Sequence, residues 1–378
     1  MKIAEIKLSI LERPGGGEHR LVEVPGLRRI QYTHKGFPTS RTEYHPFLIV
    51  RTDDGIESIV QCTQGPAQAK DMVDLLRGMA IGEDPFRREH FFQKFEVARR
   101  WLYRPYAWAG AFDHCLWDIA GKASNQPVYN LLGKVRDRIA VYLMGGDTDL
   151  DGYKRHIEAG RENSGIFAYK IHSYKGGKAD VPIIRGLRDY VGPDYDLIND
   201  PVRSYTLEEA IMIGRLMEEL DYVWLEEPIH EENILQLQEL CAALVMPVMG
   251  HEPMQADMEG SCQRLLLKAT DLIRATGLHG VTQTMKSANF AQCYGANIEL
   301  NGHGGLFGAV NTHMQMAITN TTFHEVGGDG MGVARQAEEF GAMNAPTVKD
   351  GYIAPPDGPG FGIEWDMKQF RSRLVEEY

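Results

Sequence analysis

The sequence has little of the features that mark secreted, zinc-binding or membrane proteins. Its five cysteines are odd in number, scattered and without a C-x-x-C pair, so neither a disulfide framework nor a zinc site is indicated. No apolar run approaches the roughly 20 residues of a membrane span, and the opening MKIAEIKLSILERPGGG is broken by charges before a signal-peptide core could form. We therefore expect a cytoplasmic protein with free thiols and no membrane partner.

Positive charge is also scarce. The chain has 40 Lys and Arg against 52 Asp and Glu, a net charge of −12, which argues against nucleic acid as a partner. The same charge repels an anionic substrate, so a local cation would have to overcome that repulsion. The chain has 378 residues, of which 43% are hydrophobic, so it can build a sizeable core. Its length suits two domains, or one small domain beside a barrel.

The first third of the chain has the pattern of a small α+β domain. The stretch PFLIVRTDDGIESIV (46–60) places an Asp-Asp-Gly turn between two apolar runs, which predicts an antiparallel hairpin. From about Gln68 to Gly133, apolar residues recur at spacings of three and four, which is typical of helices.

From Arg138 onward, short β-rich runs alternate with longer helical segments. Such alternation predicts parallel βα units, and eight units in roughly 200 residues fit a closed barrel of the TIM type. The runs are RIAVYLM, GIFAYKIH, YDLIND, DYVWLEEP, MPVMGHE, DLIRAT, NIELNGH and TTFHEV. Because catalytic groups of such barrels stand at the C-terminal ends of the strands, the polar residues that close each run are the candidates.

Three acidic residues close successive runs. Asp200, Glu226 and Glu252 end the third, fourth and fifth runs at equal spacings of 26 residues, about one βα unit, so their carboxylates should converge. Three carboxylates in an apolar barrel mouth would repel one another unless a cation lay between them. Oxygen ligands favour Mg²⁺ or Mn²⁺ over Zn²⁺, so we predict a site for Mg²⁺, with Mn²⁺ as an alternative.

Basic side chains close neighbouring runs. Lys170 and His172 end the second run, and side chains two apart in a strand leave the same face. His303 ends the seventh run between glycines, on roughly the opposite side of the ring, and Glu325 ends the eighth. This arrangement suits removal of a proton next to a carboxylate on one face and proton delivery on the other, so these four are the candidate catalytic residues.

Taken together, these motifs resemble the mandelate racemase subgroup of the enolase superfamily over nearly the whole chain. AFDHCLWDIAGKASNQPVYNLLG (111–133) is similar to that family's D-x-A-L-W-D helix, and DGPGFGIEW to its C-terminal PG-x-G segment. LIND, WLEEP and PVMGHE resemble its three metal-binding strand ends. Because the family uses the first glutamate of LEEP, the resemblance favours Glu226 over Glu227 as a ligand.

The resemblance also implies a domain organisation. We expect a modified (β/α)₇β barrel over residues 134–349 and an α+β N-terminal capping domain over residues 1–133, which residues 350–378 complete. Mg²⁺ would be held at the three strand-end carboxylates named above.

Two departures from the family pattern bear on the reaction. Many members have Lys-x-Lys at the second strand end, with the second lysine as base, and His172 stands at that position. The family often pairs the seventh-strand histidine with an aspartate at the end of strand six, but the two candidate positions here are Arg274 and Thr276. A histidine without that carboxylate is a weaker base, so racemisation from both faces is disfavoured.

We therefore predict an acid-sugar dehydratase, a lyase that acts on an aldonate or aldarate. His172, with the charge of Lys170 beside it, would remove the C2 proton, and Glu325 would hydrogen-bond the enediolate or carboxylate. His303 would protonate the departing 3-hydroxyl, giving a 2-keto-3-deoxy acid. An epimerase or racemase, a lactone cycloisomerase and a non-catalytic metal-binding relative are the alternatives.

Specificity in this family comes from loops of the capping domain. The stretch QYTHKGFPTSRTEYH (31–45) supplies Tyr32, His34, Arg41 and Tyr44, which could contact hydroxyls or a distal carboxylate, and Arg274 is a further substrate-binding candidate. The expected partner is a small sugar acid, and analogy with other capped barrels favours a homo-oligomer.

Overall fold

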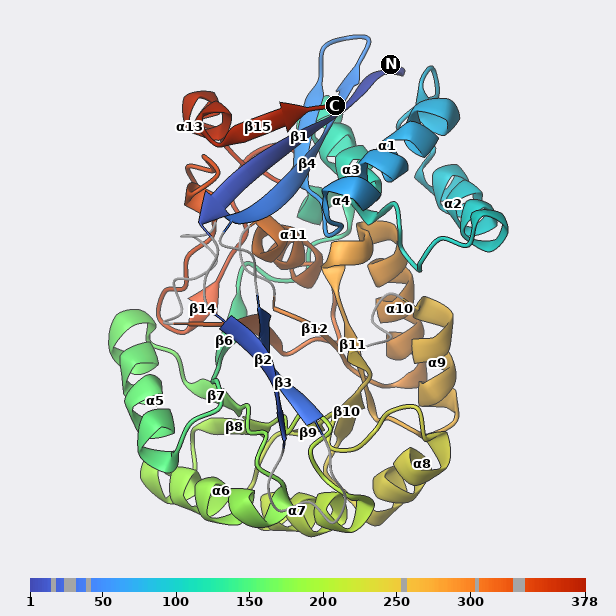
Figure 1. Ribbon diagram of the computed structural model, residues 1–378. Coiled ribbons are helices and arrows are strands. Elements are labelled where there is room, and N and C mark those ends of the chain that lie inside the picture. Colours follow the sequence, from blue (N-terminus) through green and yellow to red (C-terminus); the bar gives the residue numbers. More distant parts are fainter. Residues whose placement is uncertain (15–17, 24–31, 39–41, 253–256, 303–305, 329–336) are drawn as a thin grey trace.

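A four-stranded antiparallel sheet forms the upper part of the computed structural model in Figure 1, which describes residues 1–14, 18–23, 32–38, 42–252, 257–302, 306–328 and 337–378. The strand order is β15-β1-β4-β5. Val50 lies opposite Ser58 across the turn at Asp53–Gly55, which confirms the predicted hairpin. The C-terminal strand pairs with the N-terminal one, so both ends of the chain lie in this sheet. The strands are β1 (Ile3–Pro14), β4 (Thr42–Thr52), β5 (Glu57–Gln61) and β15 (Leu374–Glu377).

Helix α3 (Gly110–Ser124) joins this part of the molecule to the barrel. Its Asp113 accepts hydrogen bonds from the Thr282 backbone N–H at 2.9 Å and the Thr282 hydroxyl at 2.6 Å, at the start of a barrel helix. Its Asp118 accepts the N–H of Phe361 at 2.9 Å. The other helices here are α1 (Pro66–Ala80), α2 (Arg88–Leu102) and α4 (Val128–Leu131).

A ring of eight parallel strands lies below, and each of the eight predicted runs contains one of them. The order is β12-β11-β10-β9-β8-β7-β6-β13, and the short strand β14 (Tyr352–Ile353) adds to β6 in the antiparallel sense. The ring strands are β6 (Ile139–Met144), β7 (Ala168–Ile171), β8 (Asp196–Asn199), β9 (Leu225–Glu226), β10 (Val248–Gly250), β11 (Leu272–Ala275), β12 (Ile298–Leu300) and β13 (Phe323–Val326). These strands are short and mostly buried, as expected for a parallel sheet covered by helices.

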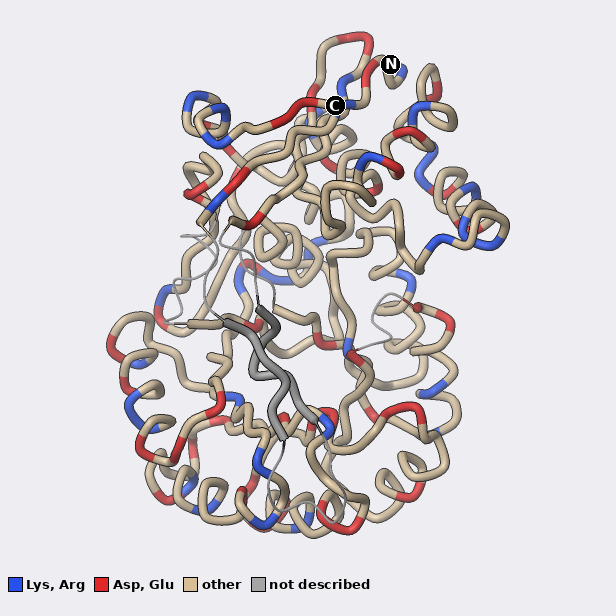
Figure 2. The backbone as a smooth tube through the Cα atoms, in the orientation of Figure 1, with Lys and Arg blue, Asp and Glu red and all other residues tan. Residues whose placement is uncertain are grey.

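Helices cover the outside of this ring, where acidic and basic residues are interspersed (Figure 2). Side-chain caps start several of them, and α7 has a full capping box in which Thr206 and Glu209 bond each other's backbone N–H groups. The covering helices are α5 (Leu150–Ser164), α6 (Gly177–Val191), α7 (Leu207–Glu219), α8 (Ile234–Ala243), α9 (Met258–Leu266), α10 (Val281–Tyr294) and α11 (Leu306–Gln315). Two short helical elements are the 3₁₀ turn η2 (Gly277–His279) and α13 (Met367–Ser372).

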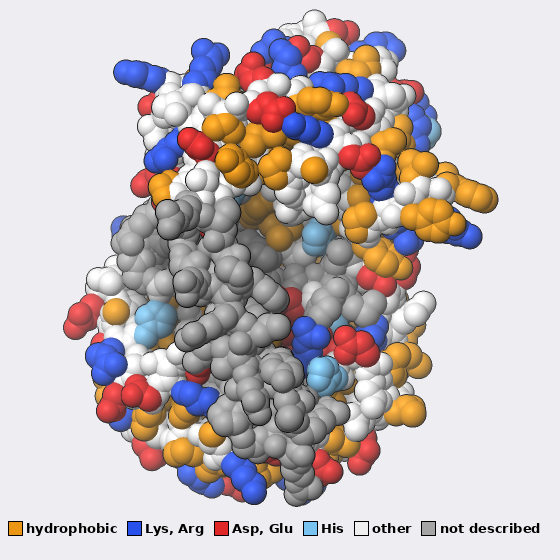
Figure 3. Space-filling view, viewed as in Figure 1, with side chains coloured by type: hydrophobic (Ala, Val, Ile, Leu, Met, Phe, Trp, Pro, Cys, Tyr) orange, Lys and Arg blue, Asp and Glu red, His pale blue; other side chains and the backbone are white. Residues whose placement is uncertain are grey.

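Two further features lie outside the ring. The hairpin of β2 (Glu18–Glu23) and β3 (Tyr32–Pro38) is drawn across the barrel opening in Figure 1. Apolar side chains gather over α2 at the right edge of Figure 3, where Trp101 and Tyr103 are 71% and 87% exposed. Among the described helices, none has the length and apolar character needed to span a membrane.

A buried carboxylate joins the two ends of the strand order. Glu299 in β12 accepts hydrogen bonds from the Thr321 hydroxyl at 3.0 Å and from the backbone N–H groups of Thr322 at 2.9 Å and Phe323 at 3.2 Å, at the start of β13. Its side chain therefore bridges the strands at which the ring closes.

Replacing Glu299 with alanine is expected to lower the free energy of unfolding by about 3 kcal/mol, because the buried donors of Thr321 and Phe323 lose their acceptor. Urea unfolding followed by circular dichroism measures this change. Glu239→Ala, on the exposed side of α8, is the control and should change stability by less than about 0.5 kcal/mol. Equal effects of the two substitutions would show that the ring closes without this bridge.

Candidate active site

One lysine lies among three carboxylates at the C-terminal ends of the barrel strands. The Nζ atom of Lys170, near the end of β7, lies 3.1 Å from Oδ2 of Asp200 and 3.2 Å from both oxygens of Glu226. It lies 2.7 Å from Oε2 of Glu325. All four side chains are buried. The parallel register brings them together, since Lys170 pairs with Ile198, two residues before Asp200.

Arg274 is the second cation of this cluster. Its Nε lies 3.1 Å from Oε1 of Glu226, its Nη2 lies 2.7 Å from Oε2 of Glu325, and its Nη1 donates to the Tyr142 hydroxyl at 3.2 Å. The guanidinium is fully buried, and the contacts described for it are with two carboxylates and one hydroxyl. Its role in substrate binding stays a prediction. Tyr142 also donates a hydrogen bond to Glu325 and was not predicted as a site residue. The only hint in the sequence was its position in RIAVYLM, where the alternation of a strand turns its side chain toward the barrel interior.

His172 is the more accessible of the two basic residues on the second strand end. Its Nε2 lies 3.2 Å from Oδ2 of Asp200, and its side chain is 19% exposed against 1% for Lys170. Burial alone would lower the pKa of His172, but the Asp200 carboxylate outweighs it and raises the pKa. Burial opposes the charge of Lys170 too, yet Glu226 and Glu325 hold its pKa well above the usual value. Lys170 is therefore a fixed cation, whereas His172 is the partly exposed residue of the two.

The third predicted metal ligand lies at the rim. Glu252 follows β10, is exposed, and accepts a hydrogen bond from Asn301 Nδ2 at 2.8 Å. Its backbone N–H donates to Glu227, so the second glutamate of LEEP links the ends of β9 and β10. The Glu226 carboxylate, by contrast, contacts Lys170 on the inner side of the barrel, where a metal ligand would be needed.

The donor set has the chemistry for a hard divalent cation. Among the described residues, no group of three or more Asp, Glu, His or Cys side chains is arranged to hold a metal ion. Nevertheless, the carboxylates of Asp200, Glu226 and Glu325 are buried around two permanent cations, Lys170 and Arg274. Burial raises the pKa of Glu226 to about 7 although both cations oppose it. When all three carboxylates are ionised, their negative charges exceed the two cations by one. An additional cation with oxygen ligands fits this excess.

Most of the other predicted site residues lie outside the part of the chain that the structure describes. His303 and Arg41 lie outside the described residues, as do the side chains of Tyr32 and His34 in β3. Tyr44 lies on β4 opposite Glu12 and is 50% exposed. Their proposed contacts with substrate remain predictions.

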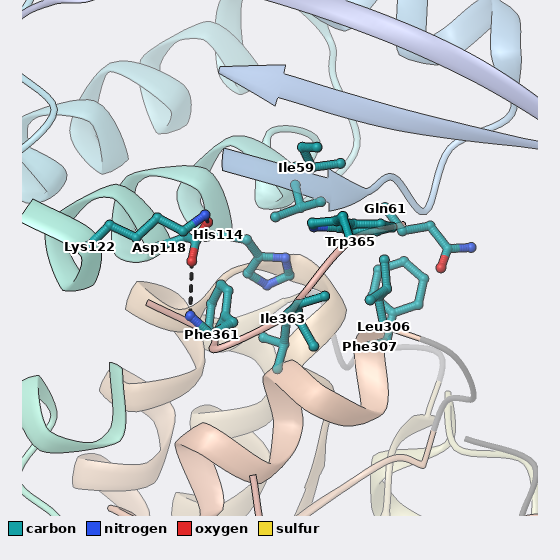
Figure 4. Close-up of a pocket in the computed structure, with 12 residues that line it drawn as sticks. Ile59, Gln61, His114, Asp118, Lys122, Leu306, Phe307, Phe361, Ile363 and Trp365 are labelled. Carbon is teal, nitrogen blue, oxygen red and sulfur yellow. Dashed lines mark hydrogen bonds and ion pairs between the residues drawn. The ribbon is translucent and has the colours of Figure 1, made fainter. Parts of the chain in front are cut away.

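A separate pocket lies between the upper sheet and the barrel (Figure 4). It is mainly apolar and lies between β5, α3, α11 and the C-terminal segment, and the Asp118 bond to Phe361 runs along its edge. His114 of α3 points into it, with Nε2 2.6 Å from the carbonyl oxygen of Gly277. None of the Lys170 cluster lines this pocket, so it is not part of the candidate site.

Curated proteins with similar sequences include two kinds of enzyme. A D-galactonate dehydratase family member from Streptomyces bingchenggensis is 29% identical over 344 residues, 79% of this chain and 82% of that protein. An arabinonate dehydratase from Saccharolobus solfataricus is 27% identical over 357 residues, 88% and 91%. A D-galactarolactone cycloisomerase from Agrobacterium fabrum is 27% identical over 343 residues, 85% and 88%.

Among solved structures, the magnesium complex of D-glucarate dehydratase from Agrobacterium tumefaciens has the same fold. It superimposes with a TM-score of 0.83 at 24% identity, covering 100% of both chains. Two family models also match: the mandelate racemase / muconate lactonizing enzyme N-terminal domain over residues 23–133, and the enolase C-terminal domain-like model over residues 152–369. Because these models follow each other along most of the sequence, the chain belongs to the mandelate racemase subgroup of the enolase superfamily.

Proposed function

We propose that this enzyme is a Mg²⁺-dependent hydro-lyase that dehydrates an aldonate or aldarate to a 2-keto-3-deoxy acid. The observation that carries the proposal is the pairing of a partly exposed His172 with a buried lysine held among Asp200, Glu226 and Glu325. The dehydratase names among the relatives support the reaction class.

The residues of the second strand end divide the work of proton removal. His172 takes the C2 proton, and the fixed charge of Lys170 favours the negative charge that develops on the substrate carboxylate. Mg²⁺ held by Asp200, Glu226 and Glu252 would neutralise the same carboxylate. His303 is proposed to protonate the departing 3-hydroxyl.

For Glu325 we propose a different role from the one predicted from sequence. It accepts hydrogen bonds from the Gly302 N–H at 3.0 Å, from Tyr142, and from Lys170 and Arg274. Although burial opposes ionisation, the two cations hold its pKa well below the usual value. An ionised carboxylate cannot donate to an enediolate, so we propose instead that Glu325 holds the two cations in place.

The end of β11 bears on the choice between dehydration and racemisation. Arg274 there contacts Glu226 and Glu325, and the Thr276 hydroxyl accepts the N–H of Leu278. Neither Arg274 nor Thr276 supplies a carboxylate to a histidine on the next strand, so neither provides the group that would strengthen a base on the second face. A cycloisomerase, which one relative is named for, needs no such pair and is the second candidate.

Proton NMR of the purified enzyme with Mg²⁺ in D₂O, against a panel of aldonates, aldarates and their lactones, tests the proposal. The expected result is the appearance of 2-keto-3-deoxy signals for at least one acid. Interconversion of a lactone without loss of the 3-hydroxyl would favour the cycloisomerase. Loss of the C2 proton signal without either product would favour an epimerase, and no reaction across the panel would contradict the proposed substrate class.

A further inference from the structure

A buried polar network lies behind the strand ends that carry His172 and Asp200. Its four members come from the loop after β7, the first turn of α6, the end of β8 and the loop before α7, and all four are 0% exposed. They are Ser173, Asp180, Asn199 and Tyr205.

Asp180 is the centre of this network. Its Oδ1 accepts a hydrogen bond from the Ser173 hydroxyl at 2.6 Å, and its Oδ2 accepts one from the Tyr205 hydroxyl at 2.6 Å. The Tyr205 oxygen in turn accepts from Asn199 Nδ2 at 2.9 Å. The carboxylate therefore has one arm toward β7 and one toward β8.

Each arm ends at the residue next to a candidate site residue. Ser173 directly follows His172, and Asn199 directly precedes Asp200. The two strand ends are also joined directly, since the Asp200 N–H donates to the carbonyl oxygen of Ile171 at 2.9 Å. A side chain that anchors a residue restricts the backbone of its neighbour, so the network limits the positions available to both His172 and Asp200.

Simple packing does not account for Asp180. Within the described part of the chain it makes no ion pair of 4.0 Å or less, and burial raises its pKa to about 6 although both hydroxyl bonds and the more distant charge of Lys175 oppose the rise. Burying a carboxylate among neutral donors costs several kcal/mol, and an apolar residue would fill the same space at lower cost. Buried polar residues of this kind often orient the side chains of a metal or catalytic site.

We propose that Asp180 is a positioning residue that sets the 3.2 Å approach of His172 to Asp200, acting on His172 through Ser173 and on Asp200 through Tyr205 and Asn199. The roles given to His172 as base and to Asp200 as metal ligand rest on the proposed function. The geometric claim, that the network holds the two side chains together, does not.

Two substitutions separate the arms. Ser173→Ala removes only the arm to His172, so kcat should fall about tenfold or more while KM and the Mg²⁺ Kd from calorimetry change by less than about twofold. Tyr205→Phe removes only the arm to Asp200, so the Mg²⁺ Kd should rise about tenfold. Asp180→Asn should show both effects. Asp189→Asn and Tyr190→Phe, on the exposed face of α6, are the matched controls and should change neither kcat nor the Mg²⁺ Kd.

A third readout needs neither turnover nor metal. The ring N–H signal of His172 in proton NMR, assigned by its loss in His172→Asn, reports the contact with Asp200. It should be protected from solvent exchange in the native enzyme and the controls, and lost or broadened in Ser173→Ala and Asp180→Asn. If no sugar acid reacts but this pattern holds, the proposed function fails and the positioning role stands. If the substitutions lower only Tm and leave the ring signal, kcat and the Mg²⁺ Kd unchanged, the network only stabilises the fold and the proposal is overturned.

Discussion

Lys170→Met is expected to lower the free energy of unfolding by about 3–5 kcal/mol and kcat by at least about 100-fold. The lysine ammonium lies within 3.2 Å of oxygens on Asp200, Glu226 and Glu325, and all three carboxylates are buried. Methionine fills much of the same volume without the charge, so the carboxylates would face one another with Arg274 as their remaining permanent cation. Denaturant unfolding and steady-state kinetics measure the two effects.

A double variant shows whether charge or volume is responsible. Glu325→Gln in the Lys170→Met background removes one of the facing charges, so the double variant should be more stable than the sum of the two single effects predicts, by about 1–3 kcal/mol. Lys178→Met, on the exposed part of α6, is the control for the substitution itself and should leave the free energy of unfolding and kcat nearly unchanged. Additive effects of the two substitutions would contradict the electrostatic explanation.

The positions of the candidate residues could be predicted from the sequence because they follow from the parallel barrel alone. In such a ring the strand ends lie at one face, so the strand-end positions were enough to name Lys170, His172, Asp200 and Glu226 as neighbours. The equal spacing did not show that Glu252 would lie exposed at the rim, where it bonds Asn301. The hairpin around Asp53–Gly55 was predictable for a similar reason, because its turn residues and flanking apolar runs are local signals.

The partners of these residues could not be predicted, since they depend on how the ring closes. Arg274 reaches Glu226 two strands away and Glu325 on β13 only after all the strands are in register. The sequence shows that Arg274 ends a strand but not which carboxylates it meets. Tyr142 was missed because a tyrosine within an apolar run has the same pattern whether its hydroxyl is bonded or merely at the edge of the core.

The buried network around Asp180 was missed for another reason. An acidic residue in the first turn of a helix is common and usually exposed, where it interacts favourably with the helix dipole. Only the packing of α6 against the ring makes Asp180 fully buried and brings Ser173 and Tyr205 to its two oxygens. Burial of a polar residue is a property of the assembled layers, and short-range sequence patterns do not contain it.

His172→Asn is expected to reduce kcat by about 10²–10⁴-fold while the free energy of unfolding changes by less than about 1 kcal/mol. Asparagine can still donate to Asp200 but cannot take a proton from carbon, and the partial exposure of the native side chain limits the loss of packing. Exchange of the C2 proton with D₂O should fall together with dehydration, because both need the same base. His90→Asn on α2 controls for loss of an imidazole elsewhere and should leave both rates unchanged.

Comparison with His303→Asn distinguishes the two proposed histidine roles. If His303 delivers the proton to the departing hydroxyl, its replacement should abolish dehydration but leave C2 exchange measurable, whereas His172→Asn should abolish both. The order follows from the chemistry, since carbon deprotonation precedes departure of the hydroxyl and can be reversed when departure is blocked. Full turnover in His172→Asn would remove this residue as the base and leave Lys170 as the remaining candidate on that strand end. In that case the lysine would have to lose its proton during turnover, although three carboxylates around it favour the charged form.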